Sequence, residues 1–205
     1  MVAFFTGLFL GLSLIIAIGA QNAFVIRQGV LKQHTLFIAL FCSIADSLLI
    51  CLGVIGISYL FKDFIYEFSH IIFGISSLWL AIYGIFRIRS AFKIHSSIYK
   101  HKLDSNKLIK TISTLTVFTF ANPHVYLDTM ILIGSVSQQF MNISKVYFSL
   151  GACTASFLWF FFIAYGARII SPLIQTPSHW RNLDLSIALV MFIIAFNLAR
   201  QGGWL

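Results

Sequence analysis

The chain has 205 residues, of which 59% are hydrophobic and only 10% are charged, and its formal net charge is +8. Because soluble domains carry about 25% charged residues, this composition excludes an ordinary soluble protein and favours a polytopic membrane protein. The basic residues lie in short segments between apolar runs and form no basic surface interleaved with aromatic residues, so nucleic-acid binding is not expected.

Six apolar runs approach the length of about 20 residues that a membrane-spanning helix needs. In chain order they cover residues 3–26, 36–61, 64–86, 108–136, 146–170 and 183–199. The first run has full-span length and no Lys or Arg before Arg27, so we interpret it as a membrane helix rather than a cleaved signal peptide. The sequence therefore predicts an all-α polytopic membrane protein with six transmembrane helices, in a single domain that covers residues 1–205.

The basic residues are unevenly distributed between the two sets of connections. The first, third and fifth connections together carry eleven Lys and Arg residues, whereas the opposite side carries three. Since loops rich in Lys and Arg remain cytoplasmic, the odd connections are predicted to be cytoplasmic and both termini external. The third connection, a basic loop at about 87–107, is interpreted as a positive-inside anchor, and a lipid head-group site is the alternative.

The basic loop divides the chain into two halves, at about 1–86 and 108–205. Because each half has three spans, the second half must enter the membrane from the opposite face, and a repeat between them would be inverted. A weak internal similarity supports this reading: residues 19–24 and 120–124 both interrupt an apolar run with a polar stretch around an Asn. We therefore predict two inverted three-helix repeats, in which helices 1 and 4 are broken.

The fourth span contains Pro123, which removes a backbone donor and clashes with the preceding turn, so the helix must break or kink there. In lipid, such a break is tolerated only against protein or a water-filled cavity. A half-helix N-terminus presents free N–H groups that suit a carboxylate, and Gln21, Asn22 and Asn122 add amide groups near the two breaks. The breaks are thus predicted to bind the carboxylate of a substrate.

Two acidic residues, Asp46 and Asp128, fall inside predicted spans. A charge at the bilayer centre costs about 2.5–3.5 kcal/mol on insertion scales, so such acids usually face a transport pathway. No Lys or Arg lies at a similar depth, so the missing cation is predicted to be the substrate, a proton, or both in turn. Exchange at two neighbouring carboxyls would provide a basis for antiport. The alternative is that each carboxyl is satisfied by hydrogen bonds between helices.

The remaining polar residues receive simpler interpretations. Asp63, Glu67, Asp104 and Asp184 are read as solvated charges in loops or at span ends. His124 lies one helical turn before Asp128 and could relay protons or bond to freed backbone, and Tyr126 is read as packing. The Gly7/Gly11 pair allows close helix packing within the protomer or in a homo-oligomer. Three cysteines without metal-ligand spacing predict reduced thiols and no metal or other cofactor.

Two strings carry a family resemblance: Gln-Asn-Ala-Phe at residues 21–24 and Asn-Pro-x-x-Tyr-Leu-Asp at residues 122–128. Together with Ser-Ile-Ala-Asp at 43–46, they resemble the LysE-type lysine/arginine exporter family, closest to its bacterial arginine exporter branch, over nearly the whole chain. The resemblance implies export of basic amino acids across a bacterial inner membrane. It assigns the acid pair to Asp46 and Asp128, and the break motifs to residues 21–22 and 122–123. The family's usual Pro in the first break is Ala20 here, so a less sharp break is expected.

The leading hypothesis is a secondary transporter that exports arginine, with lysine as a second substrate, by proton antiport. Coupling is expected because moving one positive charge outward against an inside-negative potential costs about 2.3 kcal/mol per 100 mV. An exporter of a neutral amino acid or an inorganic cation is the alternative on the same scaffold. An intramembrane hydrolase using Ser, His124 and Asp128 is disfavoured because no Gly-x-Ser-x-Gly motif accompanies them. A structural membrane subunit is a further alternative.

Overall fold

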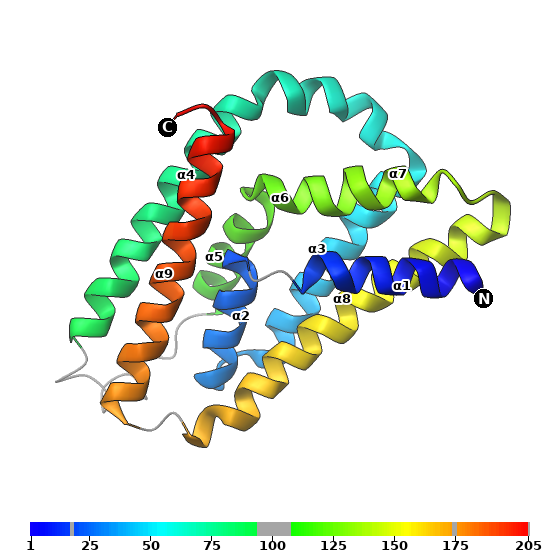
Figure 1. Cartoon of the computed structure of the whole chain (residues 1–205). Helices are drawn as coiled ribbons and strands as arrows, with labels where there is room; N and C mark the ends of the chain where they lie inside the picture. The colour runs from blue at the N-terminus through cyan, green and yellow to red at the C-terminus, as the bar shows by residue number, and fades with distance from the viewer. Residues whose placement is uncertain (17–18, 94–107, 174–175, 205) are drawn as a thin grey trace.

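The computed structural model describes residues 1–16, 19–93, 108–173 and 176–204, and within these ranges the regular structure is helical (Figure 1). The side chains of residues 57–69, 72, 93, 110, 123, 124 and 177 lie outside the description. In chain order the elements are α1 (Val2–Ile15), α2 (Ala20–Val30), α3 (Thr35–Ile55), α4 (Ile57–Lys93), α5 (Leu108–Phe120), α6 (Pro123–Tyr126), a π-helix (Leu127–Leu132), α7 (Ile133–Ser137), α8 (Asn142–Ile170), a 3-10 turn (Ser171–Leu173) and α9 (Pro177–Gln201).

Several of these helices are long and apolar enough to cross a membrane. Among the described residues, Thr35–Ile55, Asn142–Leu173 and Ser178–Gln201 each qualify, and α1 with α2 qualifies as one bent span. The predicted all-helical, multi-pass architecture is therefore confirmed at this level. The count of six crossings and the inverted repeat stay predictions.

The connection between the second and third predicted spans lies earlier than the sequence indicates. We expected a loop near residues 62–63, but α3 ends at Ile55 and α4 begins at Ile57, with Gly56 between them at φ 98°. Glycine adopts this left-handed conformation without a Cβ penalty, so it reverses the chain where a charged pair does not. At its other end α4 continues to Lys93, so the first part of the predicted basic loop is helical.

Both predicted helix breaks are present. The α1 and α2 axes differ by 82°, so the expectation that Ala20 would soften the first break is wrong. Here Gly19, in an extended conformation at φ −98° and ψ 178°, precedes α2 and separates it from α1 without a proline. In the second break α5 ends at Phe120 and α6 begins at Pro123, where the missing N–H of proline costs nothing. Figure 1 shows α1 and α7 running across the molecule, in a different direction from α2, α5 and α9.

Glycines bring the crossing helices into close contact. A Cβ added to Gly7 would lie 2.0 Å from the carbonyl oxygen of Phe148, and one added to Gly151 would lie 2.0 Å from that of Phe4. The Gly7/Gly11 pair therefore packs α1 against α8 within the protomer and gives no argument for a homo-oligomer. Glycine plays the same part where α3 meets α7, because a Cβ on Gly134 would lie 2.8 Å from the Gly53 oxygen.

We expect Gly151→Ala to lower the free energy of unfolding by about 1–3 kcal/mol, because the added methyl overlaps the backbone of α1. Gly166→Ala on the same helix is the matched control, since its Cβ meets no atom within 4 Å. That change should be neutral or stabilising by up to about 1 kcal/mol. Thermal unfolding of the purified protein in detergent, followed by tryptophan fluorescence, measures both. Equal stability of the two variants would contradict the close packing of α1 on α8.

Candidate functional site

A cavity of about 240 Å³ lies between the two helix breaks. This volume is slightly below the range of about 300–1,000 Å³ that is typical of small-molecule sites. Segments far apart in the sequence line it. They comprise Leu14, Ile15, Gly19, Gln21 and Asn22 around the first break; Asn122, Val125, Asp128 and Thr129 around the second; Asp46 of α3; Phe160 of α8; and Ile194 and Asn197 of α9. The fold thus brings two separate interruptions in the sequence to the wall of one cavity.

Five of the seven site residues predicted from the sequence line this cavity, namely Gln21, Asn22, Asp46, Asn122 and Asp128. The backbone of Pro123 and His124 begins α6 beside it. Their side chains lie outside the described residues, so the proposed His124–Asp128 proton relay stays a prediction.

Asp46 is a buried acid whose carboxyl is incompletely satisfied. Its side chain is 4% exposed, and its Oδ1 has no hydrogen-bond partner among the described residues. The Gln21 amide faces this carboxyl, yet its Nε2 is also buried without a hydrogen bond of normal geometry in the described part of the chain. A buried polar atom without a partner costs about 1–3 kcal/mol, so this pair is arranged for a ligand that supplies the missing bonds.

Asp128 supplies the second carboxyl of the cavity. It is half-buried in the π-helix Leu127–Leu132, directly after the second break, and it is near enough to Asp46 for the two charges to interact. Short π-helical segments frequently occur at functional sites. Two carboxyls that face one small cavity repel each other when both are ionised, so the arrangement favours occupancy by a cation or a proton.

Side chains satisfy the backbone carbonyls that the breaks release. Asn22 Nδ2 donates to Ile15 O at 2.9 Å across the first break. At the second, Tyr126 Oη donates to Phe120 O at 2.8 Å, and Ser76 Oγ of α4 donates to Ala121 O. Membrane interiors demand such partners. The interpretation of Tyr126 as packing is therefore incomplete, because its hydroxyl also donates to a carbonyl at the break. A donor a few residues after a proline break is a sequence signal that could have identified this role.

Two lining residues carried no signal in the sequence. Thr129 is 3% exposed, and its hydroxyl donates to Val125 O at 2.5 Å. Asn197 reaches the cavity from α9, the last helix. A single amide in a terminal apolar run is usually a helix–helix contact, so its position in the site depends on how α9 packs.

The structure contradicts the interpretation of Asp184 as a solvated charge. It is 1% exposed, and its Oδ1 lies 3.1 Å from Arg27 Nε and 3.6 Å from Arg87 Nη1. The two arginines, which the sequence places in cytoplasmic connections, are themselves mostly buried at 13% and 17% side-chain exposure. This ion cluster joins α2, α4 and α9 and is separate from the cavity lining.

Comparison with known proteins places this geometry in a family context. The profile of the LysE type translocator family matches residues 12–202. The arginine exporter protein ArgO of Klebsiella pneumoniae is 38% identical over 199 residues, which cover 97% of this chain and 94% of that protein. The proteins of the same name from Salmonella schwarzengrund and Enterobacter sp. are each 36% identical with the same coverage. No solved structure shows significant similarity.

We expect Tyr126→Phe to lower the free energy of unfolding by about 0.5–1.5 kcal/mol, because it removes the hydrogen bond to the Phe120 carbonyl. The matched control is Tyr147→Phe on α8, where the side chain is 47% exposed. Thermal unfolding in detergent compares the two. A Tyr126→Phe protein as stable as the control would show that the hydroxyl does not stabilise the break.

Proposed function

Because the chain belongs to the LysE type translocator family, we propose that it exports basic amino acids, arginine and also lysine, across a bacterial inner membrane. Membership of this family makes the chain a transporter and not an enzyme. The observation that carries the proposal is that Asp46, Asp128 and both helix breaks line one cavity. The full-length similarity to proteins named arginine exporters supports the same substrate class.

The cavity offers complementary groups for the two ends of a basic amino acid. The guanidinium or ammonium group of the substrate pairs with the carboxyls of Asp46 and Asp128. Its α-carboxylate takes the backbone N–H groups at the start of α2 and the free Gln21 amide. Broken helices hold substrates in this way in other secondary transporters. An inorganic cation would leave the amide and the helix terminus unused, so a basic amino acid fits the cavity better.

We expect Asp46→Asn and Asp128→Asn each to reduce arginine efflux by about tenfold or more, because a buried cation without its counter-charge loses at least 1.4 kcal/mol. The change preserves the shape of the side chain. Efflux of labelled arginine, lysine and a neutral amino acid from proteoliposomes measures the effect. The matched control is Asp104→Asn, which the sequence places in the basic loop.

Retention of arginine efflux by both variants would contradict the site. Loss of arginine efflux with a neutral amino acid still transported by Asp128→Asn would instead favour a neutral substrate on the same scaffold.

We propose proton antiport as the driving mechanism. Export of a cation against an inside-negative potential is unfavourable by about 2.3 kcal/mol per 100 mV, so an uncoupled carrier would favour uptake. Two neighbouring carboxyls can carry protons inward after releasing the cationic substrate outward. The proximity of Asp46 and Asp128 in one cavity supports this exchange.

An imposed proton gradient, acidic on the side to which arginine is exported, should therefore accelerate arginine efflux from proteoliposomes several-fold. A proton ionophore should abolish that acceleration. Arginine efflux should acidify the compartment that arginine leaves, because protons move in the opposite direction. If the proton gradient does not change arginine flux, antiport is excluded, and export driven by a high internal arginine concentration is the remaining mechanism.

We also propose that the chain crosses the membrane six times as two inverted repeats, with the basic loop cytoplasmic. The contacts support an approximate two-fold relation between α1–α4 and α5–α9. Equivalent helices touch one another, α3 with α8 and α4 with α9. In chain order α1 corresponds to α5 and α2 to α6–α7, and the second half of each broken span packs on the middle helix of the other repeat. Thus α2 packs on α8 at Gly29, and α7 packs on α3 at Gly134.

A further inference from the structure

We propose that Arg27, Asp184 and Arg87 form a gate that closes the cavity toward the face of the protein that carries the basic loop. The three residues, defined here as the ion cluster, come from α2, α9 and α4. The inference depends on the proposed function only in taking the cavity as the transport site.

The order of residues along α2 shows three successive layers. Gln21 and Asn22 line the cavity, Phe24 lies in the buried apolar core one turn on, and Arg27 reaches the ion cluster in the following turn. At 1.5 Å per residue, the distance along the helix from Asn22 to Arg27 is about 8 Å. A substrate that leaves the cavity along α2 must therefore pass an apolar layer and then the ion cluster.

The helix α9 shows the same spatial order from the cavity to the ion cluster, but it runs in the opposite chain direction. Asn197 and Ile194 line the cavity, Met191 and Ile187 belong to the apolar core, and Asp184 holds the ion cluster. The helix α4 follows the last two steps of this order, since it contributes Tyr83 to the core and, about one turn on, Arg87 to the ion cluster.

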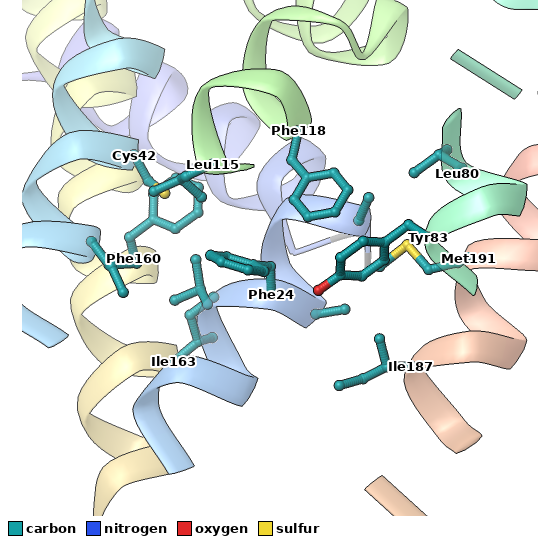
Figure 2. Packing of buried hydrophobic residues seen from close by; sticks show 14 of the residues in the cluster. Phe24, Cys42, Leu80, Tyr83, Leu115, Phe118, Phe160, Ile163, Ile187 and Met191 are labelled. Atoms are coloured by element: carbon teal, nitrogen blue, oxygen red, sulfur yellow. The ribbon is translucent and has the colours of Figure 1, made fainter. Parts of the chain in front are cut away.

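The middle layer is closed by aromatic side chains. The ring centroids of Phe24 and Phe118 are 5.5 Å apart, and those of Phe118 and Tyr83 are 4.7 Å apart at an interplanar angle of 86°. Figure 2 shows these rings between the helices, with Met191 and Ile187 beside them. Each of these side chains is at most 9% exposed, so this layer has no room for an amino acid.

The ion cluster stabilises the closed arrangement of the adjacent aromatic layer. The buried Asp184 carboxylate accepts a hydrogen bond from Arg27 at 3.1 Å and forms an ion pair without a hydrogen bond to Arg87 at 3.6 Å. The Arg87 guanidinium also lies 4.9 Å from the centre of the Tyr83 ring. Passage of a substrate requires α2 to separate from α4 and α9, which breaks the Arg27–Asp184 pair and leaves the Arg87–Asp184 pair between α4 and α9 in place. Buried ion pairs contribute little net stability because desolvation offsets their attraction, so such a contact suits repeated breaking and re-forming.

Accessibility of the cavity tests the gate. A Val125→Cys reporter is placed in the cavity of a protein whose Cys42, Cys51 and Cys153 have been replaced by Ala. A membrane-impermeant maleimide is then added to right-side-out and to inside-out vesicles, so both faces are probed. Asp184→Asn should accelerate labelling from the basic-loop face by about tenfold or more, because the arginines lose their counter-charge. Labelling from the other face should slow.

The matched control is Asn182→Ala, an exposed position two residues away on α9, which should leave both rates unchanged. Arg87→Gln keeps the Arg27–Asp184 pair and should give a smaller acceleration of the same sign, and it serves where Asp184→Asn fails to accumulate in the membrane. If both variants label from the basic-loop face at the rate of the control, the ion cluster only stabilises the fold and the gate is wrong.

Labelling needs no substrate, so the gate and the proposed function can fail separately. Asp46→Asn should stop arginine efflux without accelerating labelling from the basic-loop face. If labelling confirms the gate but the protein does not transport arginine, the proposed substrate is wrong and the gate is retained.

Discussion

The backbone carbonyls released by two interrupted helices impose the main constraint on this molecule. Water cannot satisfy them within a bilayer, so side chains must. Asn22, Tyr126 and Ser76 donate to carbonyls at the two breaks, and each donor lies near the cavity that the breaks enclose. The interruptions are thereby stable features of the fold, and the helix ends and amide groups that they expose become available to a ligand.

Among the described residues, the two acids that are almost fully buried have different surroundings. Asp184 receives two arginines from the chain itself. Asp46 is equally buried, but one of its oxygens has no hydrogen-bond partner among the described residues, and the neighbouring Gln21 amide is likewise unsatisfied. Unsatisfied buried groups lower stability, and at Asp46 and Gln21 they lie at the wall of the cavity, where a bound molecule can reach them.

Close helix contacts make both arrangements possible. Glycines on α1, α3, α7 and α8 allow backbones to approach until a single added methyl would overlap a carbonyl oxygen. These contacts fix the crossing half-helices, α1 and α7, against α8 and α3. On the other side of each break, α2 packs closely on α8 at Gly29, but α2 and α5 meet each other through larger apolar side chains, Phe24 and Phe118. Side-chain packing of that kind can separate and re-form more readily than backbone held against backbone.

The sequence by itself determined the features that depend on short stretches of chain. Apolar runs of span length predicted a multi-pass helical protein, and Pro123 predicted a break because its ring excludes a continuous helix. Acids inside apolar runs identified Asp46 and Asp128, and family strings identified the amides beside them. The tertiary structure decided whatever depends on distant partners. The sequence indicated a solvated Asp184 because its partner Arg27 is 157 residues away in the chain. Local patterns determine where a chain is apolar, bent or charged, whereas the environment of a charge depends on which distant helices fold against it.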